Sequence, residues 1–530
     1  MRTWQKWTMA CVLILHCSLL AWSASRHSPV VDEVGHLPAG LSHWRLQRFD
    51  LYSVNPPLVR TIATAPLHLM NVPIEFTGYQ TLPRLRPEFL IGTRWITVYP
   101  DSFHRHFTIA RWACIPFSLL GAVVCMMWAR ELHGSRADWM ALCLWCFCPN
   151  ILAHASLITP DAAATAVGLT ACYVFRKWLI HRSMGWAIFS GILLGLTLLT
   201  KFTWLFLLGL WPACWLVLRV SRRHSPSDAM RLAADDSDHE SQFVTRRVTG
   251  TLVPRWRDDV GHLSVIVLLA FWVLNNGYLF EDSFQPLGKF QFFSHSLSGH
   301  EPGVKAAEGG NRFHGTLLEH LPMPVPRNFV QGIDHIKWEY EQGYPSYLRG
   351  VKRHGGWWYY YLYAMLVKLP VGTLVLIAVA AGQGVFYHRC HGEPEQQTRR
   401  ADAQPLAVGD WFETLYLLVP AVCTLWLVSS QTGFNHHLRY VLPAFPFLFI
   451  FASRTALLLD SRYRVAKAVP IVCMAWMIIS SLSVYPQNPY HSLLQREPDD
   501  LIGYSMRVYH IKPVQENAAI ATDLNDINQE

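Results

Sequence analysis

Residues 107–129 read FTIARWACIPFSLLGAVVCMMWA, an apolar run in which Arg111 is the single charged side chain. A helix rises about 1.5 Å per residue, so a helix of this length crosses a hydrocarbon core of roughly 30 Å. Soluble cores rarely contain one such run, and this sequence contains about eleven. The run therefore predicts a membrane-spanning helix, and its repetition predicts a polytopic membrane protein.

The composition agrees with that class. Of the 530 residues, 51% are hydrophobic and only 15% are charged, whereas soluble proteins carry roughly a quarter charged residues. We expect an all-α bundle of about 11 transmembrane helices, with Gly191 and Gly195 interrupting the fifth and Arg176 and Lys177 ending the fourth. The expected spans are 7–24, 107–129, 138–156, 162–180, 185–200, 202–219, 262–280, 359–383, 412–430, 440–458 and 467–484.

Lys and Arg in the short connections set the expected orientation. With Arg2 and Lys6 in the cytoplasm, the basic connections fall on the cytoplasmic side, and the short exterior loops hold almost none beyond Lys201 and Arg439. This asymmetry accounts for the net charge of +8 without a nucleic-acid partner. An odd number of spans places the C-terminal tail outside. We expect a multi-pass protein of the bacterial plasma membrane, or of the endoplasmic reticulum if eukaryotic.

One membrane domain is expected over residues 1–484. Its long connections are a first exterior loop at 25–106, a flexible cytoplasmic loop at 220–261 and an exterior loop at 281–358, and an exterior tail follows at 485–530. The first span could instead be a cleaved signal peptide, because Ala21-Trp22-Ser23 resembles a small-x-small cleavage site. The next loop lies on the same face in either case.

Three acidic residues stand at the exterior edge. Asp32 and Glu33 follow the first span directly, and Asp161 follows Pro160 in a short exterior link. A carboxylate in this position can act as the base for an acceptor hydroxyl, and a neighbouring carboxylate can hold the acceptor or a metal ion. The alternatives are a solvated loop for Asp32 and Glu33, and a helix cap for Asp161.

Four cations accompany these acids at the same edge: Arg111, Lys201, Lys368 and Arg439. A Lys or Arg inside a span is costly and usually faces a cavity or a partner. The simpler alternative is a side chain that extends to the interface. Acids and cations that converge at one membrane face suit a carrier with a phosphate head and an apolar tail, because the cations can hold the departing phosphate.

These residues resemble a known family. Asp32-Glu33-Val34-Gly35-His36, Asn55-Pro56-Pro57-Leu58-Val59-Arg60, the Gly-rich run ending in Thr200-Lys201-Phe202, and His436-His437-Leu438-Arg439-Tyr440 occur in order along the chain. Their pattern is similar to that of the dolichyl-phosphate-mannose protein mannosyltransferases (glycosyltransferase family 39) and their bacterial relatives in the GT-C superfamily, including the aminoarabinose lipid A transferases. Asn55 stands where the family has His, and Arg60 where it has Lys.

The resemblance implies a GT-C bundle with amphipathic helices in the first exterior loop, broken at Pro56 and Pro57. It implies an inverting transfer of a sugar, with mannose as one candidate, from a polyprenyl- or dolichyl-phosphate carrier to a protein, lipid or glycan hydroxyl. The implied base is Asp32, with Glu33 as the alternative. Arg60 joins the four cations as a phosphate ligand, and Asp161 is the second acid.

The remaining candidates are His437 and the aromatic cluster of Trp357, Trp358 and Tyr359, which could contact the sugar or cover the site. An interfacial aromatic belt is the alternative for the cluster. A divalent metal ion, Mg²⁺ or Mn²⁺, is an optional cofactor with Glu33 and Asp161 as candidate ligands.

Two other classes of protein fit parts of the pattern. A lipid-linked glycan ligase or polymerase would use the same face and the same cations. A transporter would be expected to show related halves and polar groups near the midplane, whereas these residues gather at one face.

Overall fold

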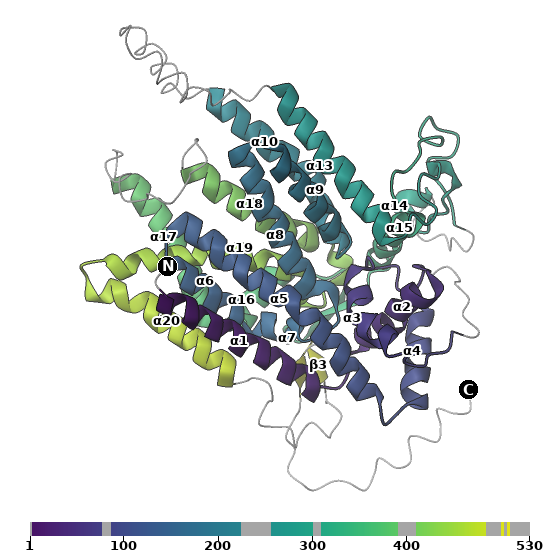
Figure 1. The fold of residues 1–530 in the computed structure, drawn as a ribbon, viewed down its shortest axis with the longest axis horizontal. Coiled ribbons are helices and arrows are strands. Elements are labelled where there is room, and N and C mark those ends of the chain that lie inside the picture. Colours follow the sequence, from purple (N-terminus) through teal and green to yellow (C-terminus); the bar gives the residue numbers. More distant parts are fainter. Residues whose placement is uncertain are drawn as a thin grey trace.

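The computed structural model describes residues 3–76, 86–223, 256–299, 309–390, 410–483, 500–502 and 506–508. Most of them form helices, which pack into a bundle (Figure 1). Most of the predicted loop 220–261, the whole predicted tail 485–530 except two short strands, and residues 300–308 of the predicted exterior loop lie outside the described residues.

The helices, in chain order, are α1 (Thr3–Arg26), α2 (Val31–Leu46), α3 (Leu58–Leu69), α4 (Pro87–Val98), α5 (Phe103–His133), α6 (Ala137–Cys146), α7 (Pro149–Ala155), α8 (Pro160–His181), α9 (Met184–Leu198), α10 (Leu207–Arg223), α13 (Trp256–Gly277), α14 (His295–Ser298), α15 (Arg327–Glu341), α16 (Tyr360–Lys368), α17 (Val371–Cys390), α18 (Asp410–Ser430), α19 (Phe445–Ala452) and α20 (Arg464–Ser483). Short 3₁₀ helices are η1 (Phe202–Phe206), η3 (Leu287–Lys289), η5 (Thr432–Phe434), η6 (Leu438–Ala444) and η7 (Ser453–Asp460). Strand β1 (Pro345–Leu348) pairs with β2 (Val351–His354), and β3 (Asp500–Ile502) with β4 (Met506–Val508), both antiparallel.

The predicted membrane class is confirmed. Within the described residues, seven helical segments are long and apolar enough to cross a membrane, and the number rises to nine if two bent helix pairs each count as one span. The predicted count of about eleven is not confirmed, because the expected span 138–156 contains the short helices α6 and α7 and the expected span 185–200 contains only the shorter apolar helix α9. The chain is a multi-pass integral membrane protein.

Prolines break two segments that were predicted to be continuous. Cys148 is extended before Pro149, where α6 has ended and α7 begins; Leu369 is extended before Pro370, where α16 and α17 meet at 115°. The 112° bend between α7 and α8 falls in the link that was predicted between the spans 138–156 and 162–180. The residue before a proline disfavours the helical conformation because of a clash with the proline ring. The predicted spans 138–156 and 359–383 were therefore wrong as single straight helices.

The glycines of α9 allow close packing rather than interrupting the helix. A Cβ added at Gly191 would lie 2.8 Å from the Ile266 carbonyl oxygen, and one at Gly195 would lie 2.6 Å from the Val273 Cβ. Both neighbours belong to α13. Helix α9 therefore continues through Gly191 and Gly195, because their missing side chains let α13 approach.

A buried ionic network explains the charge inside α8. Arg176 is 2% exposed. Its Nη2 and Nε donate to Glu413 of α18 at 2.7 and 2.8 Å, and its Nη1 donates to Glu131 of α5 at 2.8 Å. Two carboxylates compensate the buried guanidinium, so Arg176 stabilises the packing of α5, α8 and α18 only while both partners remain.

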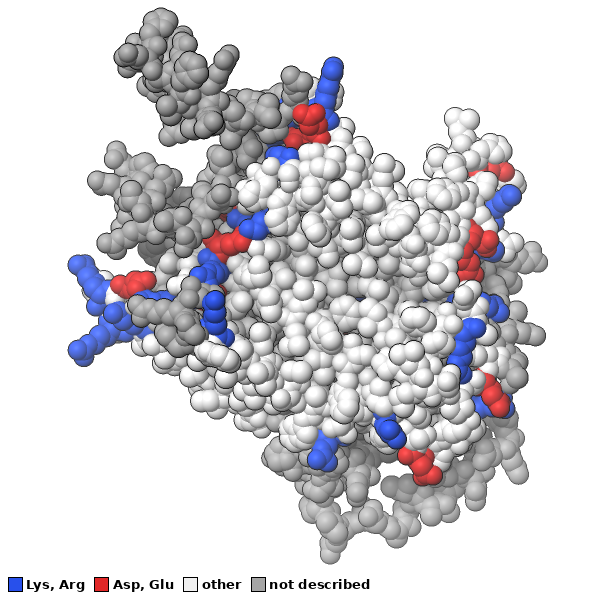
Figure 2. All heavy atoms as spheres, in the orientation of Figure 1, with Lys and Arg blue, Asp and Glu red and all other residues white. Residues whose placement is uncertain are grey.

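The helices predicted in the first exterior loop are present as α2, α3 and α4, which lie together at one end of the bundle near α14 and α15 (Figure 1). Asn55, Pro56 and Pro57 separate α2 from α3, as expected from the two prolines. Figure 2 shows charged side chains mainly at two opposite ends of the drawn face, with a broad band of uncharged residues between them. That band matches a hydrocarbon-facing surface.

Candidate active site

Four predicted site residues meet at the end of the bundle that was predicted to face the exterior, and we call Asp32, Asp161, Lys201 and Arg439 the outer cluster. Arg439 Nη2 donates to Asp32 Oδ2, and Lys201 Nζ lies 2.7 Å from Asp161 Oδ1. Arg439 Nε also lies 3.8 Å from Asp161 Oδ2. Two carboxylates and two cations thus form one connected chain of ion pairs.

Local structure sets each of these positions. Asp32 and Asp161 lie in the first turns of α2 and α8, where the helix dipole favours a negative charge. Lys201 is an extended residue between α9 and η1, and Arg439 is the second residue of η6. Four segments far apart in the sequence therefore converge at the outer cluster.

The outer cluster is partly open to solvent. The exposed fraction of the side chain is 28% for Asp32, 14% for Arg439, 12% for Lys201 and 4% for Asp161. Burial raises the pKa of Asp32, but the charge of Arg439, the charge of His36 and the hydrogen bond from Arg439 outweigh burial and hold that pKa below its ordinary value. Asp32 is therefore ionised at neutral pH and able to accept a proton.

Sequence reasoning missed three neighbours of the outer cluster. His36 stacks on Tyr52 at 4.0 Å between ring centroids, and burial, reinforced by the charge of Arg60, lowers the pKa of His36 to about 3. His154 of α7 interacts electrostatically with both Asp161 and Arg439. Tyr440 makes a cation–π contact with Lys201, whose Nζ lies 5.2 Å from the centroid of the tyrosine ring. The signal for His36 was its position one helical turn after Asp32.

Glu33 and Arg111 lie outside the outer cluster and bind each other. Arg111 Nε and Nη2 donate to Glu33 at 2.9 and 2.6 Å, and the side chains are 1% and 0% exposed. Glu33 also accepts the backbone N–H groups of Val30 at 3.0 Å and Ile158 at 3.1 Å. The structure does not bring this predicted alternative base and this predicted phosphate ligand to an accessible surface.

Arg60 is also buried, with 2% exposure. Its Nε donates to His43 Nε2 and its Nη1 to the Asn55 carbonyl oxygen, each at 2.8 Å. Burial lowers the pKa of Arg60 to about 10. These bonds connect α2 with α3 and place Arg60 beside the outer cluster rather than in it.

The other candidates border the site to different degrees. The charge of Lys368 acts on His154, so this lysine lies on the α7 side of the outer cluster. His437 contacts Tyr440 with ring centroids 5.8 Å apart. In the aromatic cluster, the Trp357 backbone N–H donates to Asn435 at 2.7 Å, whereas Trp358 and Tyr359 are 67% and 39% exposed.

The two proposed metal ligands do not form a metal-binding set. Glu33 is engaged by Arg111 and Asp161 by Lys201 and Arg439. The described part of the chain contains no group of three or more His, Cys, Asp or Glu side chains that could hold a metal ion. This arrangement does not fit Mg²⁺ or Mn²⁺, and metal dependence stays a prediction.

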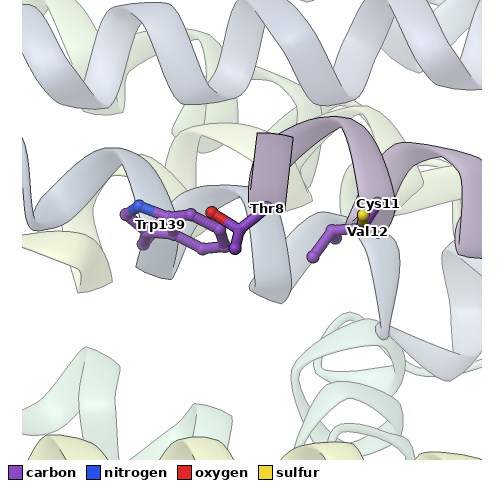
Figure 3. Close-up of a pocket in the computed structure, with 4 residues that line it drawn as sticks. All are labelled: Thr8, Cys11, Val12 and Trp139. Carbon is purple, nitrogen blue, oxygen red and sulfur yellow. The ribbon is translucent and has the colours of Figure 1, made fainter. Parts of the chain in front are cut away.

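A cavity of about 540 Å³ lies between α1 and α6, lined by Thr8, Cys11, Val12 and Trp139 (Figure 3). The lining carries no charged side chain and shares no residue with the outer cluster. The cavity therefore offers no carboxylate, imidazole or cation, and the outer cluster remains the candidate active site.

Two crystal structures are similar to this chain: ArnT from Cupriavidus metallidurans bound to undecaprenyl phosphate, and the same protein in the apo state. Both are 16% identical in sequence, with TM-scores of 0.47 and 0.43. The matches cover 93% and 92% of this chain and 67% and 66% of the other chains, so this chain spans about two thirds of their length. No curated protein matches the chain.

Residues 100–232 match the profile of a protein family described as dolichyl-phosphate-mannose-protein mannosyltransferase. The matched segment includes Asp161 and Lys201, whereas Asp32 and Arg439 lie outside it. The match covers about a quarter of the chain, and of the four motifs quoted from the sequence only the Gly-rich run ending in Thr200-Lys201-Phe202 lies within it.

Proposed function

We propose that this chain is a membrane glycosyltransferase that moves a sugar from a polyprenyl-phosphate carrier to a hydroxyl acceptor on the exterior face of the membrane. The observation that carries the proposal is the outer cluster, which combines a partly exposed carboxylate with two cations at the edge of an apolar bundle. The family match over residues 100–232 supports the same reaction class and favours mannose as the sugar.

Lys201 and Arg439 are the proposed phosphate ligands. Each is ion-paired with a carboxylate and retains 12–14% side-chain exposure. A phosphate that enters the site can share the N–H groups of both cations, because guanidinium and ammonium groups each carry several donors. Their charge would stabilise the polyprenyl phosphate as it leaves, so the leaving group needs no added proton.

Asp32 is the proposed general base. The acceptor oxygen would form a bond to the sugar C1 as the bond between C1 and the phosphate oxygen breaks, with the electron pair leaving on the phosphate. Asp32 would take the acceptor proton, and the single displacement would invert the configuration at C1. When phosphate draws Arg439 away, Asp32 would lose the cation that lowers its basicity, which couples donor binding to proton removal.

A transfer assay with the purified full-length protein in liposomes tests this proposal. The donors would be radiolabelled polyprenyl-phosphate mannose, glucose and aminoarabinose, offered with peptide, lipid and glycan acceptors. We expect one donor to give a product whose anomeric configuration, read by NMR, is opposite to that of the donor. No transfer from any polyprenyl-phosphate sugar, or a product with retained configuration, would contradict the proposal.

A further inference from the structure

A second pocket lies at the end of the bundle that the Lys and Arg distribution assigns to the cytoplasm. It has a volume of about 280 Å³ and is lined by Trp215, Leu216, Arg219, Val220 and Trp256. These residues belong to the C-terminal half of α10 and the first residue of α13, which reach the same end of the bundle (Figure 1). The proposed transferase reaction uses none of them.

The charges around this pocket are unevenly balanced. Asp259 is 3% exposed and accepts a hydrogen bond from Trp215 Nε1 at 2.9 Å. Its Oδ2 is also 3.3 Å from Arg182 Nη1 and 3.5 Å from Arg219 Nη1. The single carboxylate of Asp259 is thus shared between the guanidinium groups of Arg182 and Arg219. The pocket lining itself contains Arg219 and no acidic side chain, so it can attract an anion.

Arginine and tryptophan side chains are paired around the pocket. Arg219 lies 5.8 Å from the Trp215 ring centroid, and Arg257 lies 5.7 Å from that of Trp256. Stacking fixes the plane of a guanidinium, and its N–H donors match the oxygens of a phosphate. Arg219 keeps 22% side-chain exposure while its Nη1 lies 3.5 Å from Asp259 Oδ2.

The same lining has an apolar side. Leu216 is 53% exposed and Val220 is 46% exposed. Trp256, which is also 53% exposed, has the amphipathic ring that prefers the membrane–water interface. A ligand with a charged head and an apolar chain would satisfy both sides, whereas a free anion would leave Leu216 and Val220 uncovered.

We propose that this pocket binds the phosphate-bearing head group of an anionic membrane lipid, with Arg219 contacting the phosphate and Leu216 and Val220 contacting the first acyl methylenes. Basic pockets between helices on the cytoplasmic side suit such head groups because the adjoining leaflet is anionic. This inference is independent of the proposed transferase function. A free phosphate shares the head-group chemistry and is separated from the lipid by the test.

The test titrates purified full-length protein in detergent and counts bound ligand by native mass spectrometry. The probes are dioctanoyl phosphatidylglycerol, dioctanoyl phosphatidylcholine and inorganic phosphate. We expect phosphatidylglycerol to bind at least five-fold more tightly than phosphatidylcholine. Arg219→Gln should weaken phosphatidylglycerol binding about five-fold, the effect of one basic residue near an anionic lipid surface. Trp256→Ala, which removes an exposed wall of the pocket, should weaken it as well.

Two further variants separate this site from general surface charge. Asp259→Asn removes the carboxylate that competes for Arg219, so phosphatidylglycerol should bind more tightly. Arg94→Gln is the matched control, because Arg94 is 62% exposed, pairs only loosely with Glu75 at 3.5 Å and lies at the other end. Equal phosphatidylglycerol affinity in Arg219→Gln and Arg94→Gln would overturn the site. Inorganic phosphate that binds as tightly, with the same dependence on Arg219, would overturn the lipid assignment.

Discussion

Asp32 and Glu33 are neighbours in the sequence, but the structure gives them opposite surroundings. Glu33 is fully buried and receives four hydrogen bonds, two from Arg111 and two from backbone N–H groups. Asp32 is 28% exposed and shares its one cation, Arg439, with Asp161. A carboxylate with every acceptor position filled holds structure together, whereas one with an exposed side and a shared partner can exchange partners during a reaction.

Arg111 shows the same distinction on the cationic side. Besides Glu33, it donates to the carbonyl oxygens of Ala24 and His27 at 2.9 and 2.7 Å and of Ser28 at 3.0 Å. These bonds connect α5 to the turn between α1 and α2. Within the part of the chain that the structure describes, the side chains of Lys201 and Arg439 donate to Asp161 and Asp32 and make no comparable set of bonds to backbone carbonyl oxygens. We therefore expect Arg111 to stabilise the fold and the other two cations to bind the donor.

The largest expected effect breaks the buried pair. Glu33→Gln leaves the Arg111 guanidinium buried without a counter-charge, which should lower the free energy of unfolding by about 3–5 kcal/mol. Thermal unfolding in detergent measures the effect. Glu75→Gln is the control, because Glu75 is 68% exposed and should change stability by less than about 1 kcal/mol. A Glu33→Gln protein as stable as the control would show that the buried pair is not structural.

A smaller effect is expected from the cations of the outer cluster. Lys201→Ala and Arg439→Ala should each weaken donor binding by about 1.5–3 kcal/mol, the range for a hydrogen bond to a charged group. That range corresponds to roughly ten- to 150-fold in the donor Kd. A direct donor-binding titration would measure it, with Lys352→Ala on exposed strand β2 as the control. Unchanged donor binding in both cluster variants would show that these side chains only reach toward the interface.

The sequence predicted which charged residues gather in the outer cluster, but it did not predict which acid pairs with which cation. Asp32, Asp161, Lys201 and Arg439 were all expected at one exterior face, because their charges flank apolar spans. Which cation serves which acid depends on three-dimensional packing, so Arg111 could not be assigned to Glu33 from sequence. The buried pair and the outer cluster contain the same types of residue, and they differ in solvent exposure and in their hydrogen bonds to the backbone.

The same limit applies to the helices. Apolar runs located the expected spans that the described residues confirm, but they could not show the breaks before Pro149 and Pro370, since a short apolar helix and half of a longer one look alike. Gly191 and Gly195 were interpreted as interruptions because their partners on α13 are far away in the sequence. Length and hydropathy predict membrane helices, whereas breaks and close contacts depend on tertiary structure.

The pH dependence of kcat/KM should sharpen the comparison, because this parameter reports the free enzyme. Asp32 must be deprotonated to act as a base, so activity should fall as pH drops through its folded-state pKa. Burial raises that pKa, but Arg439 and His36 together outweigh burial and hold it below the ordinary carboxyl value, which places the fall in activity at low pH. Arg439→Gln should move the acid limb to higher pH, whereas Lys352→Ala should not move it. If activity falls at the same pH in Arg439→Gln as in the wild type, Arg439 does not lower the pKa of Asp32.

The smallest expected effect concerns the aromatic cluster. Trp358 is 67% exposed, and stacking on a sugar would make its removal cost about 0.5–1.5 kcal/mol in donor KM. Trp272→Ala is the control, because Trp272 is 57% exposed and lies within the apolar helix α13. Identical donor KM values in the two variants would assign Trp358 to an interfacial belt.

The most direct test of the central claim is single-turnover transfer by Asp32→Asn, with the donor already bound. Asparagine keeps the shape of the side chain and removes its basicity, so the rate should fall by about 10²–10⁴-fold while donor binding stays close to that of the wild type. Asp101→Asn, an exposed acid before α5, should transfer at the wild-type rate. Transfer by Asp32→Asn at close to the wild-type rate would contradict the assignment of Asp32 as the base.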